Sequence, residues 1–166
     1  VFSLPVDGSP AKQLTHSAEE SFFAVSSMPN GNGFLYNADQ GGNELDHIYL
    51  MDKAGNTTDL TPFDSAKSSF SGWSHDLTTM YFASNARDSR FFDLYKKPVS
   101  DITNPDAATI LYENSEGLDF GAVSDDERYL ALVKPITTSN NELYLYDRKT
   151  EKLTHISEHT GDARYN

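Results

Sequence analysis

The sequence predicts an all-β protein built from repeated four-stranded antiparallel sheets, and three observations support this fold class. Aromatic residues lie in short clusters with β-branched neighbours, and no segment shows a helical period longer than one turn. An Ile/Leu-Tyr pair recurs at intervals of about 50 residues, at positions 48–49, 94–95 and 143–144. Apolar residues also form continuous runs, as in residues 34–36 and 129–133.

The continuous runs predict how the sheets pack. A sheet with one face in water alternates apolar and polar residues, whereas a continuous run indicates a sheet that is buried on both faces. Four-stranded units at this period, each covered on both faces by like units, are typical of the blades of a β-propeller. A β-sandwich is the competing all-β architecture, but it does not predict an internal repeat. We therefore predict a propeller fragment with about three complete blades and partial blades at both ends.

The repeat divides the chain into blades. Residues 1–15 supply the end of one blade, and residues 157–166 begin another. Three complete blades are expected between them, at residues 16–61, 62–113 and 114–156.

Each blade is expected to contain four short strands joined by turns. In the first complete blade these strands lie near Phe22–Ser26, Phe34–Ala38, His47–Asp52 and Thr57–Leu60. A Leu-Thr pair marks the closing strand at positions 14–15, 60–61 and 153–154. Polar loops between the second and third strands, all on one rim, are expected at residues 39–46, 85–90 and 135–141.

A Ser-x-Asp element is expected to form the turn between the first and second strands. It occurs as Ser74 with Asp76 and as Ser124 with Asp126. Serine and aspartate side chains accept hydrogen bonds from backbone N–H groups about two residues further on, which fixes a tight turn. Trp73 directly precedes the first of these turns and is expected to anchor its strand in the apolar core.

The composition excludes several classes of function. The chain has 13 Lys and Arg against 25 Asp and Glu, a formal charge of −12, so no basic stripe is available for nucleic acid. It has no cysteine, which excludes disulfides, thiolate zinc sites and a cysteine nucleophile. No apolar run approaches the ~20 residues that span a bilayer. Residues 1–5 are too short and uncharged for a signal peptide, and because the chain starts without Met we expect a piece of a longer protein.

The segment from Trp73 to Tyr95 closely resembles the repeat of TolB-like propellers, which usually reads Trp-Ser-Pro-Asp-Gly, a strand, Ser-Asn-Arg-Asp-Gly and then Asp-Leu-Tyr. The matching residues are Trp73, Ser74, Asp76, Ser84, Asn85, Arg87, Asp88, Asp93, Leu94 and Tyr95. The segment departs from the pattern at His75 and Leu77, where proline and glycine are usual, and by the additional Ala86. The third complete blade keeps its Ser-x-Asp turn but has Val123 in place of the tryptophan.

The same repeat builds the N-terminal propeller of prolyl-oligopeptidase-type serine peptidases, including acylaminoacyl-peptidase and dipeptidyl-peptidase-like members, and residues 39–50 and 59–63 look like segments of that group. The resemblance implies a non-catalytic fragment that controls the access of peptides to a hydrolase domain outside this chain. Its partners would be that domain, the remaining blades and peptide substrates, and open blade edges would permit self-association. The alternative is a TolB-like propeller that binds a protein partner and has no enzyme domain.

No catalytic residue, cofactor or metal is expected in this chain. Residues 72–76, Gly-Trp-Ser-His-Asp, look like a nucleophile elbow, but the last position is Asp instead of glycine and a strand follows instead of a helix. The five histidines show no metal-ligand spacing. The acidic run at residues 125–127 is more typical of a solvated turn than of a cation site.

Arg87 and Arg90 are the candidate functional residues. They lie in the segment that matches the propeller repeat, in an expected rim loop, and in the resembling peptidases rim loops can face the active-site cavity. Both are therefore candidates for the substrate-facing rim. The competing interpretation is a local ion pair with Asp88 or Asp93.

Overall fold

The structure is a computed structural model that describes residues 1–16 and 20–165. It contains one two-stranded sheet and three four-stranded sheets, all of them antiparallel. We call the two-stranded sheet the N-terminal ribbon and the others blades 1, 2 and 3.

The N-terminal ribbon consists of β1 (Phe2–Ser3) and β2 (Lys12–Gln13). Blade 1 consists of β3 (Phe22–Ser27), β4 (Gly33–Ala38), β5 (His47–Asp52) and β6 (Thr57–Asp59). Blade 2 consists of β7 (Ser68–Trp73), β8 (Thr79–Asp88), β9 (Phe91–Pro98) and β10 (Thr109–Tyr112), with short 3-10 helices at Val99–Asp101 and Pro105–Ala107. Blade 3 consists of β11 (Asp119–Val123), β12 (Tyr129–Thr137), β13 (Asn140–Asp147) and β14 (Lys152–His155).

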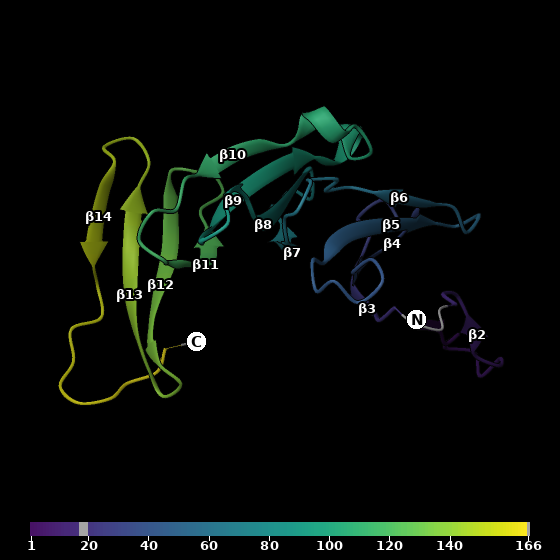
Figure 1. Ribbon diagram of the computed structural model, residues 1–166, viewed down its shortest axis with the longest axis horizontal. Helices are drawn as coiled ribbons and strands as arrows, with labels where there is room; N and C mark the ends of the chain where they lie inside the picture. The colour runs from purple at the N-terminus through teal and green to yellow at the C-terminus, as the bar shows by residue number, and fades with distance from the viewer. Residues whose placement is uncertain (17–19, 166) are drawn as a thin grey trace.

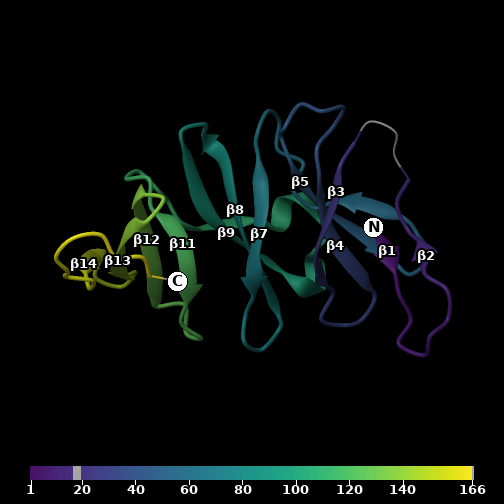
Figure 2. The same ribbon diagram turned by 90° about the horizontal axis from the view of Figure 1, so that it is seen from below.

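The blades are arranged like the segments of a fan. Within each blade the strands lie side by side in chain order. Figure 1 shows the first strands β3, β7 and β11 on the concave side of the fan and the last strands β6, β10 and β14 on its outer side. Figure 2 shows the N-terminal ribbon beside blade 1 and the C-terminus beside blade 3. This arrangement confirms the predicted all-β propeller fragment.

The apolar core is divided into layers between adjacent blades. The layer between blades 1 and 2 contains Met28, Leu35, Ile48, Leu60, Met80, Phe82, Tyr95 and Ile102. The layer between blades 2 and 3 contains Tyr81, Leu94, Leu111, Leu118, Leu130 and Leu132. Tyr81 and Phe82 are neighbours in β8 and enter opposite layers, because successive side chains of a strand point to opposite faces. Both faces of this sheet are buried, which explains the continuous apolar run at residues 81–83 of β8.

The prediction of a polar loop between the second and third strands is wrong for two of the three blades. In blade 2, β8 and β9 extend into residues 85–90, and in blade 3, β12 and β13 extend into residues 135–141. Both hairpins contain a register shift near the tip, in blade 2 between Ser84 and Asp88. A bulge of this kind accommodates additional polar residues while the strands stay paired, so polar composition did not mark a loop. In blade 1, residues 39–46 do connect β4 to β5 without a strand.

The Leu-Thr pair at residues 153–154 is not equivalent to the earlier pairs. In blade 1, the backbone N–H of Ile48 donates to Thr61 Oγ1 at 2.9 Å. In blade 3, the backbone N–H of Leu143 donates to Ser157 Oγ at 2.6 Å. Ser157 therefore occupies the place of Thr61, because serine supplies the same hydroxyl acceptor.

The chain after β14 returns along the tip of the β12–β13 hairpin. Residues 156–165 contain no strand. The backbone N–H of Asn141 donates to the carbonyl of Ala163 at 3.0 Å, and the Asn141 side-chain oxygen accepts from the N–H of Tyr165 at 2.8 Å. This segment is held by blade 3 without extending its sheet.

Candidate functional site

The two Ser-x-Asp turns have the same geometry. In blade 2, Ser74 Oγ donates to Asp76 Oδ1 at 2.6 Å, and the same oxygen accepts from the Thr78 N–H at 3.1 Å. In blade 3, Ser124 Oγ donates to Asp126 Oδ1 at 2.6 Å. These bonds favour the charged carboxylates and lower the pKa of both aspartates, with the serine hydroxyl as the largest cause. The four side chains are thus occupied in holding turns.

The residue after each aspartate adopts the left-handed conformation, which costs a non-glycine residue roughly 1–2 kcal/mol. Leu77 has a φ of 60° and Glu127 a φ of 54°. Glu127 also accepts hydrogen bonds from the Tyr81 hydroxyl at 3.0 Å and from Lys96 Nζ, both in blade 2. Burial first, and then the bond to Glu127, raise the pKa of Tyr81 to about 12. In blade 3 the turn residue therefore also links two blades.

Trp73 closes one end of the layer between blades 1 and 2. Its ring lies 5.3 Å from that of Phe70, and it packs against the apolar core of this layer. Its Nε1–H donates to Ser26 Oγ of blade 1 at 2.8 Å. Val123 ends the first strand of blade 3 in the same way but has no side-chain donor for such a bond.

Arg87 is held in a buried polar network. Its Nε and Nη2 donate to Asp93 at 2.6 and 2.8 Å, and Nη2 also donates to the carbonyl of Asn114 at 2.9 Å. Asp93 is fully buried and also accepts from the Asn114 backbone N–H at 2.7 Å. The bonds to Asp93 are the largest cause that raises the pKa of Arg87. The guanidinium therefore ties the β8–β9 hairpin to the segment that leads into blade 3.

Arg90 lies at the tip of the β8–β9 hairpin. Its Nε and Nη2 donate to Asp88 at 3.0 and 2.7 Å, and its guanidinium lies 5.2 Å from the centre of the Phe91 ring. These bonds lower the pKa of Asp88 to about 2. The Arg90 side chain is 74% exposed, against 33% for Arg87. Both arginines thus have local ion pairs, and contact of either with a substrate stays a prediction.

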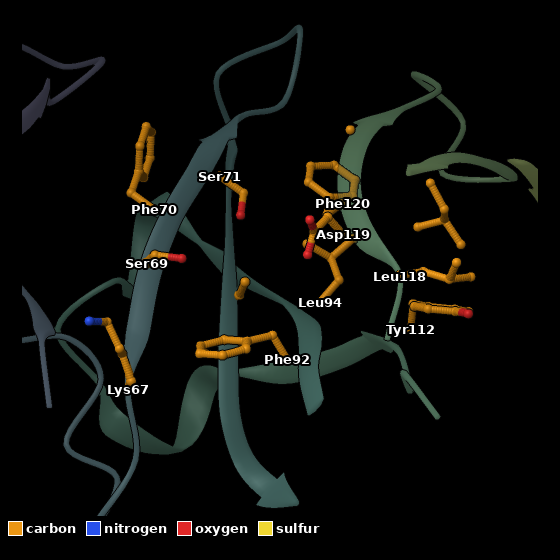
Figure 3. A pocket seen from close by; sticks show the side chains of 13 residues that line it. Lys67, Ser69, Phe70, Ser71, Phe92, Leu94, Tyr112, Leu118, Asp119 and Phe120 are labelled. Atoms are coloured by element: carbon orange, nitrogen blue, oxygen red, sulfur yellow. The ribbon is translucent and has the colours of Figure 1, made fainter. Parts of the chain in front are cut away.

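A cleft of about 500 Å³ opens between β7 and β11, the first strands of blades 2 and 3 (Figure 3). Its floor includes the buried side chains of Leu94, Leu118 and Leu132. The rings of Phe92 and Phe120 face the space between the strands (Figure 3). The volume and the mixed lining are in the range of ligand sites in proteins. We treat this cleft as the candidate binding site.

Two small residues line the cleft at a register where blade 1 has larger ones. Ser69 of β7 pairs with Ala83 of β8, and both line the cleft. The equivalent pair of blade 1 is Phe23 with Asn37, since both pairs lie two steps before the bulge of the first strand. The prediction from sequence missed this site. The signal that could have indicated it is the three serines among residues 68–71, which leave Phe70 as the one bulky side chain in this part of an expected strand.

Two charged residues lie at the cleft, and only Lys67 is neutralised. Its ammonium lies 2.9 Å from an Asp46 carboxylate oxygen. Figure 3 shows this ammonium directed away from Asp119, on the opposite side of the cleft. Asp119 is exposed, and among residues 1–16 and 20–165 its carboxylate has no ion-pair or hydrogen-bond partner. The cleft therefore presents one free negative charge.

A Ser-His-Glu cluster beside β13 lacks the geometry of a hydrolytic triad. Ser157 Oγ lies 3.3 Å from His155 Nε2 and donates to Glu142 Oε2 at 3.0 Å. Glu142 Oε2 contacts the same Nε2 of His155. In a triad the serine and the carboxylate take opposite ring nitrogens, so this arrangement does not transfer a proton between them. The Ser157 hydroxyl is also buried and accepts from the Leu143 N–H.

Within residues 1–16 and 20–165, no group of three or more His, Asp or Glu side chains could hold a metal ion. Within the same residues, no helix has the length and apolar character needed to cross a membrane.

Comparisons with known proteins agree with this architecture. The family model described as prolyl oligopeptidase, N-terminal beta-propeller domain, matches residues 15–166. No curated protein matches the sequence. Among solved structures, TolB from Acinetobacter baumannii is similar with a TM-score of 0.58 and 19% identity, over 95% of this chain and 37% of that one. A putative TolB from Agrobacterium tumefaciens has a TM-score of 0.61 and 17% identity, over 93% of this chain and 55% of that one.

These comparisons differ in what they establish. At 19% and 17% identity the likeness to the two TolB structures shows the fold alone, and this chain spans only 37% and 55% of them. The family model, in contrast, matches the sequence itself over nearly its whole length. The chain therefore belongs to the family of prolyl oligopeptidase N-terminal β-propeller domains.

Proposed function

We propose that this chain is a non-catalytic part of the propeller of a larger prolyl-oligopeptidase-type serine peptidase, and that it limits the access of peptides to a hydrolase domain outside this chain. The observation that carries the proposal is the family match over residues 15–166. Two serines lie beside a histidine in a way that could suggest a nucleophile, and their geometry supports the proposal. Ser74 stabilises a turn, and Ser157 accepts a hydrogen bond from the backbone of β13.

A physical argument supports the role in access. The first strands of the three blades line the concave side of the fan (Figure 1), and no strand of one blade pairs with a strand of the next. In a closed ring such strands would surround a passage whose width is set by side chains. An extended peptide would pass through this space, whereas a folded domain would not.

The complete reading frame of the parent protein provides the first test. A downstream α/β segment of about 250 residues with a Gly-x-Ser-x-Gly motif supports the proposal. The parent is then compared on a short peptide and on a folded protein that carries the same cleavage sequence. We expect kcat/KM to be at least about tenfold higher for the peptide, a factor that corresponds to about 1.4 kcal/mol in activation free energy. Equal values would contradict the role in access.

The 166-residue chain provides the second test. We expect no hydrolysis of peptide amides or esters by this chain. Each described serine either makes structural hydrogen bonds or has no histidine and carboxylate arranged around it as in a catalytic triad. Hydrolysis that persists in Ser74→Ala and in Ser157→Ala would contradict the assignment of the chemistry to another domain.

The second candidate is a TolB-like propeller that binds a protein partner and has no enzyme domain. The alignment of two TolB structures with 95% and 93% of this chain favours it. A reading frame that ends shortly after the propeller would support this candidate. Self-association through open blade edges is tested separately by light scattering over a range of concentrations, and a monomer at every concentration would exclude it.

A further inference from the structure

We propose that the cleft between β7 and β11 binds an extended peptide segment in which a large apolar side chain, preferably aromatic, is next to a basic residue. The apolar side chain enters the space beside Ser69 and Ala83, and the basic group pairs with Asp119. The proposal names the class of peptide that the propeller recognises, and in that respect it rests on the proposed function.

The lining of the cleft favours an aromatic side chain. Phe92 is 40% exposed, so its ring keeps apolar surface in contact with water. The buried leucines below it give an apolar floor. An incoming ring can pack against Phe92 and Phe120 in the offset or edge-on arrangements that aromatic pairs prefer. Ser69 and Ala83 leave the space that such a ring needs.

The backbone at the cleft favours an extended peptide over a compact small molecule. β7 and β11 are both edge strands of their sheets. The free edge of a strand offers N–H and C=O groups that an extended peptide can pair with. In β11, Asp119, Gly121 and Ala122 are exposed. A peptide that pairs with this edge directs one side chain into the cleft and the next towards the opposite face of the sheet. Asp119 lies at the boundary, since it lines the cleft and also, with its pairing partner Val133, a second hollow beside the β12–β13 hairpin. The residue next to the apolar one can therefore reach its carboxylate.

The charge at the cleft selects a cation. Lys67 is held by the Asp46 carboxylate at 2.9 Å, and it also donates to the Glu44 carbonyl at 3.4 Å. Asp119 has no such partner among the described residues, so its charge is available to a ligand. An arginine or lysine can form a charge-assisted hydrogen bond with it, whereas an acidic side chain would meet an unpaired like charge. The formal charge of −12 on the whole chain acts in the same direction.

Fluorescence anisotropy with the 166-residue chain tests the proposal. The probes are three fluorescein-labelled peptides of equal length: Gly-Gly-Phe-Arg-Gly-Gly, a version with Glu in place of Arg, and a version with Ala in place of Phe. We expect the Phe-Arg peptide to bind at least about tenfold more tightly than either of the others. Equal affinities for the Phe-Arg and Phe-Glu peptides would overturn the proposal.

Two matched variants locate the charge. Asp119→Asn is expected to weaken binding of the Phe-Arg peptide about three- to fivefold, as for an ion pair near the surface, and to remove most of the preference over the Phe-Glu peptide. Asp125→Asn is the control, because this carboxylate is 78% exposed in the β11–β12 turn, outside the cleft. Equal effects of the two substitutions would show a general charge effect and overturn the assignment to Asp119.

Filling the cleft tests its apolar part. Ser69→Leu is expected to reduce binding of the Phe-Arg peptide at least about tenfold, since the new side chain occupies the ligand's space. Near-UV circular dichroism checks that the variant is folded. In the unaltered chain, NMR amide shifts of residues 69–71 and 119–121 are expected to move on titration, while the Trp73 indole signal stays in place. Shifts confined to other residues would overturn the site.

The outcomes separate this inference from the proposed function. A parent enzyme that discriminates by substrate size, together with no peptide binding to the cleft, would remove the inference alone. Selective binding of the Phe-Arg peptide by a chain whose parent has no hydrolase domain would remove the proposed function alone. Binding of free indole, with no binding of any of the three peptides, would assign the cleft to small molecules and overturn the inference.

Discussion

The two layers between blades are built from different side chains, although they occupy equivalent places in the fold. The layer between blades 1 and 2 contains stacked aromatic rings, with Phe82 and Tyr95 5.2 Å apart, and it is closed at one end by Trp73. It also holds Lys97, which is fully buried and donates to the carbonyl of Leu60 at 2.8 Å. Burial lowers the pKa of this lysine.

The layer between blades 2 and 3 contains mainly leucines and opens into the cleft beside Ser69. Polar links hold its edges, through Glu127 at one turn and Arg87 at the opposite hairpin. No strand pairs across either layer, so side chains alone decide how tightly adjacent blades close. One layer is thus filled with aromatic rings, whereas the other leaves an open cleft between its two sheets.

The first prediction compares Phe82→Ala with Leu132→Ala. The two residues are equivalent, because each pairs with the last residue before the bulge of the first strand. We expect Phe82→Ala to lower the free energy of unfolding by about 4 kcal/mol and Leu132→Ala by about 2–3 kcal/mol. Leu132 lines an open cleft, so its removal enlarges an existing space instead of creating a closed cavity. Denaturant unfolding measures both values, and equal losses would contradict the difference between the layers.

The second prediction concerns the network of Asp93. We expect Asp93→Ala to lower the free energy of unfolding by about 2–3 kcal/mol, because it leaves Arg87 without its buried partner. Arg90→Ala is the matched control at the same hairpin. Its ion pair is exposed, so we expect a change within about 0.5 kcal/mol. A large effect of Arg90→Ala would show that the exposed pair also contributes to stability.

The third prediction concerns acid. The pKa of Asp147 is lowered from 3.8 to about 2, first by hydrogen bonds from Arg128. A lowered pKa means that the carboxylate stabilises the folded state above its ordinary pKa, and that this contribution is lost as pH falls from about 4 towards 2. Asp147→Asn should therefore make stability less dependent on pH in this range. Denaturant midpoints measured between pH 5 and about 2 give the comparison; parallel curves for variant and wild type would contradict it.

The fourth and smallest prediction compares the two left-handed turn residues. Leu77→Gly should raise the free energy of unfolding by about 0.5–1 kcal/mol, because glycine adopts a φ of 60° without a steric penalty. Glu127→Gly relieves the same strain but removes the bonds to Tyr81 and Lys96. We expect it to be neutral or destabilising. A gain at Glu127 as large as that at Leu77 would show that the link between blades 2 and 3 contributes nothing.

Local interactions explain which features could be predicted from sequence. The turn from Ser74 to Thr79 is stabilised by hydrogen bonds within six consecutive residues, so its pattern is visible in the chain itself. Burial on both faces of a sheet also leaves a local trace, the continuous apolar run at residues 81–83. Together with the repeat of the Ile/Leu-Tyr pair, these signals predicted a propeller of stacked four-stranded sheets.

Features that depend on pairing between distant residues could not be predicted. The length of β8 depends on a bulge near Ser84, which lets polar residues stay in the strand. The cleft depends on Ser69 and Ala83 standing opposite each other, and on Phe120 of the next blade. The partners of Arg87 include Asn114, 27 positions away. Residue type alone does not specify which distant residues come into contact.

One residue pair between the first and second strands of each blade has a further consequence for protein engineering. Phe23 with Asn37, Ser69 with Ala83 and Asp119 with Val133 occupy the same register in the three blades. Exchanging two side chains in one blade should therefore transplant a recess from one junction to another while the scaffold is left intact. A redesign that gives every blade the same consensus sequence would remove these differences between blades. Such a redesign should therefore leave these positions free to vary.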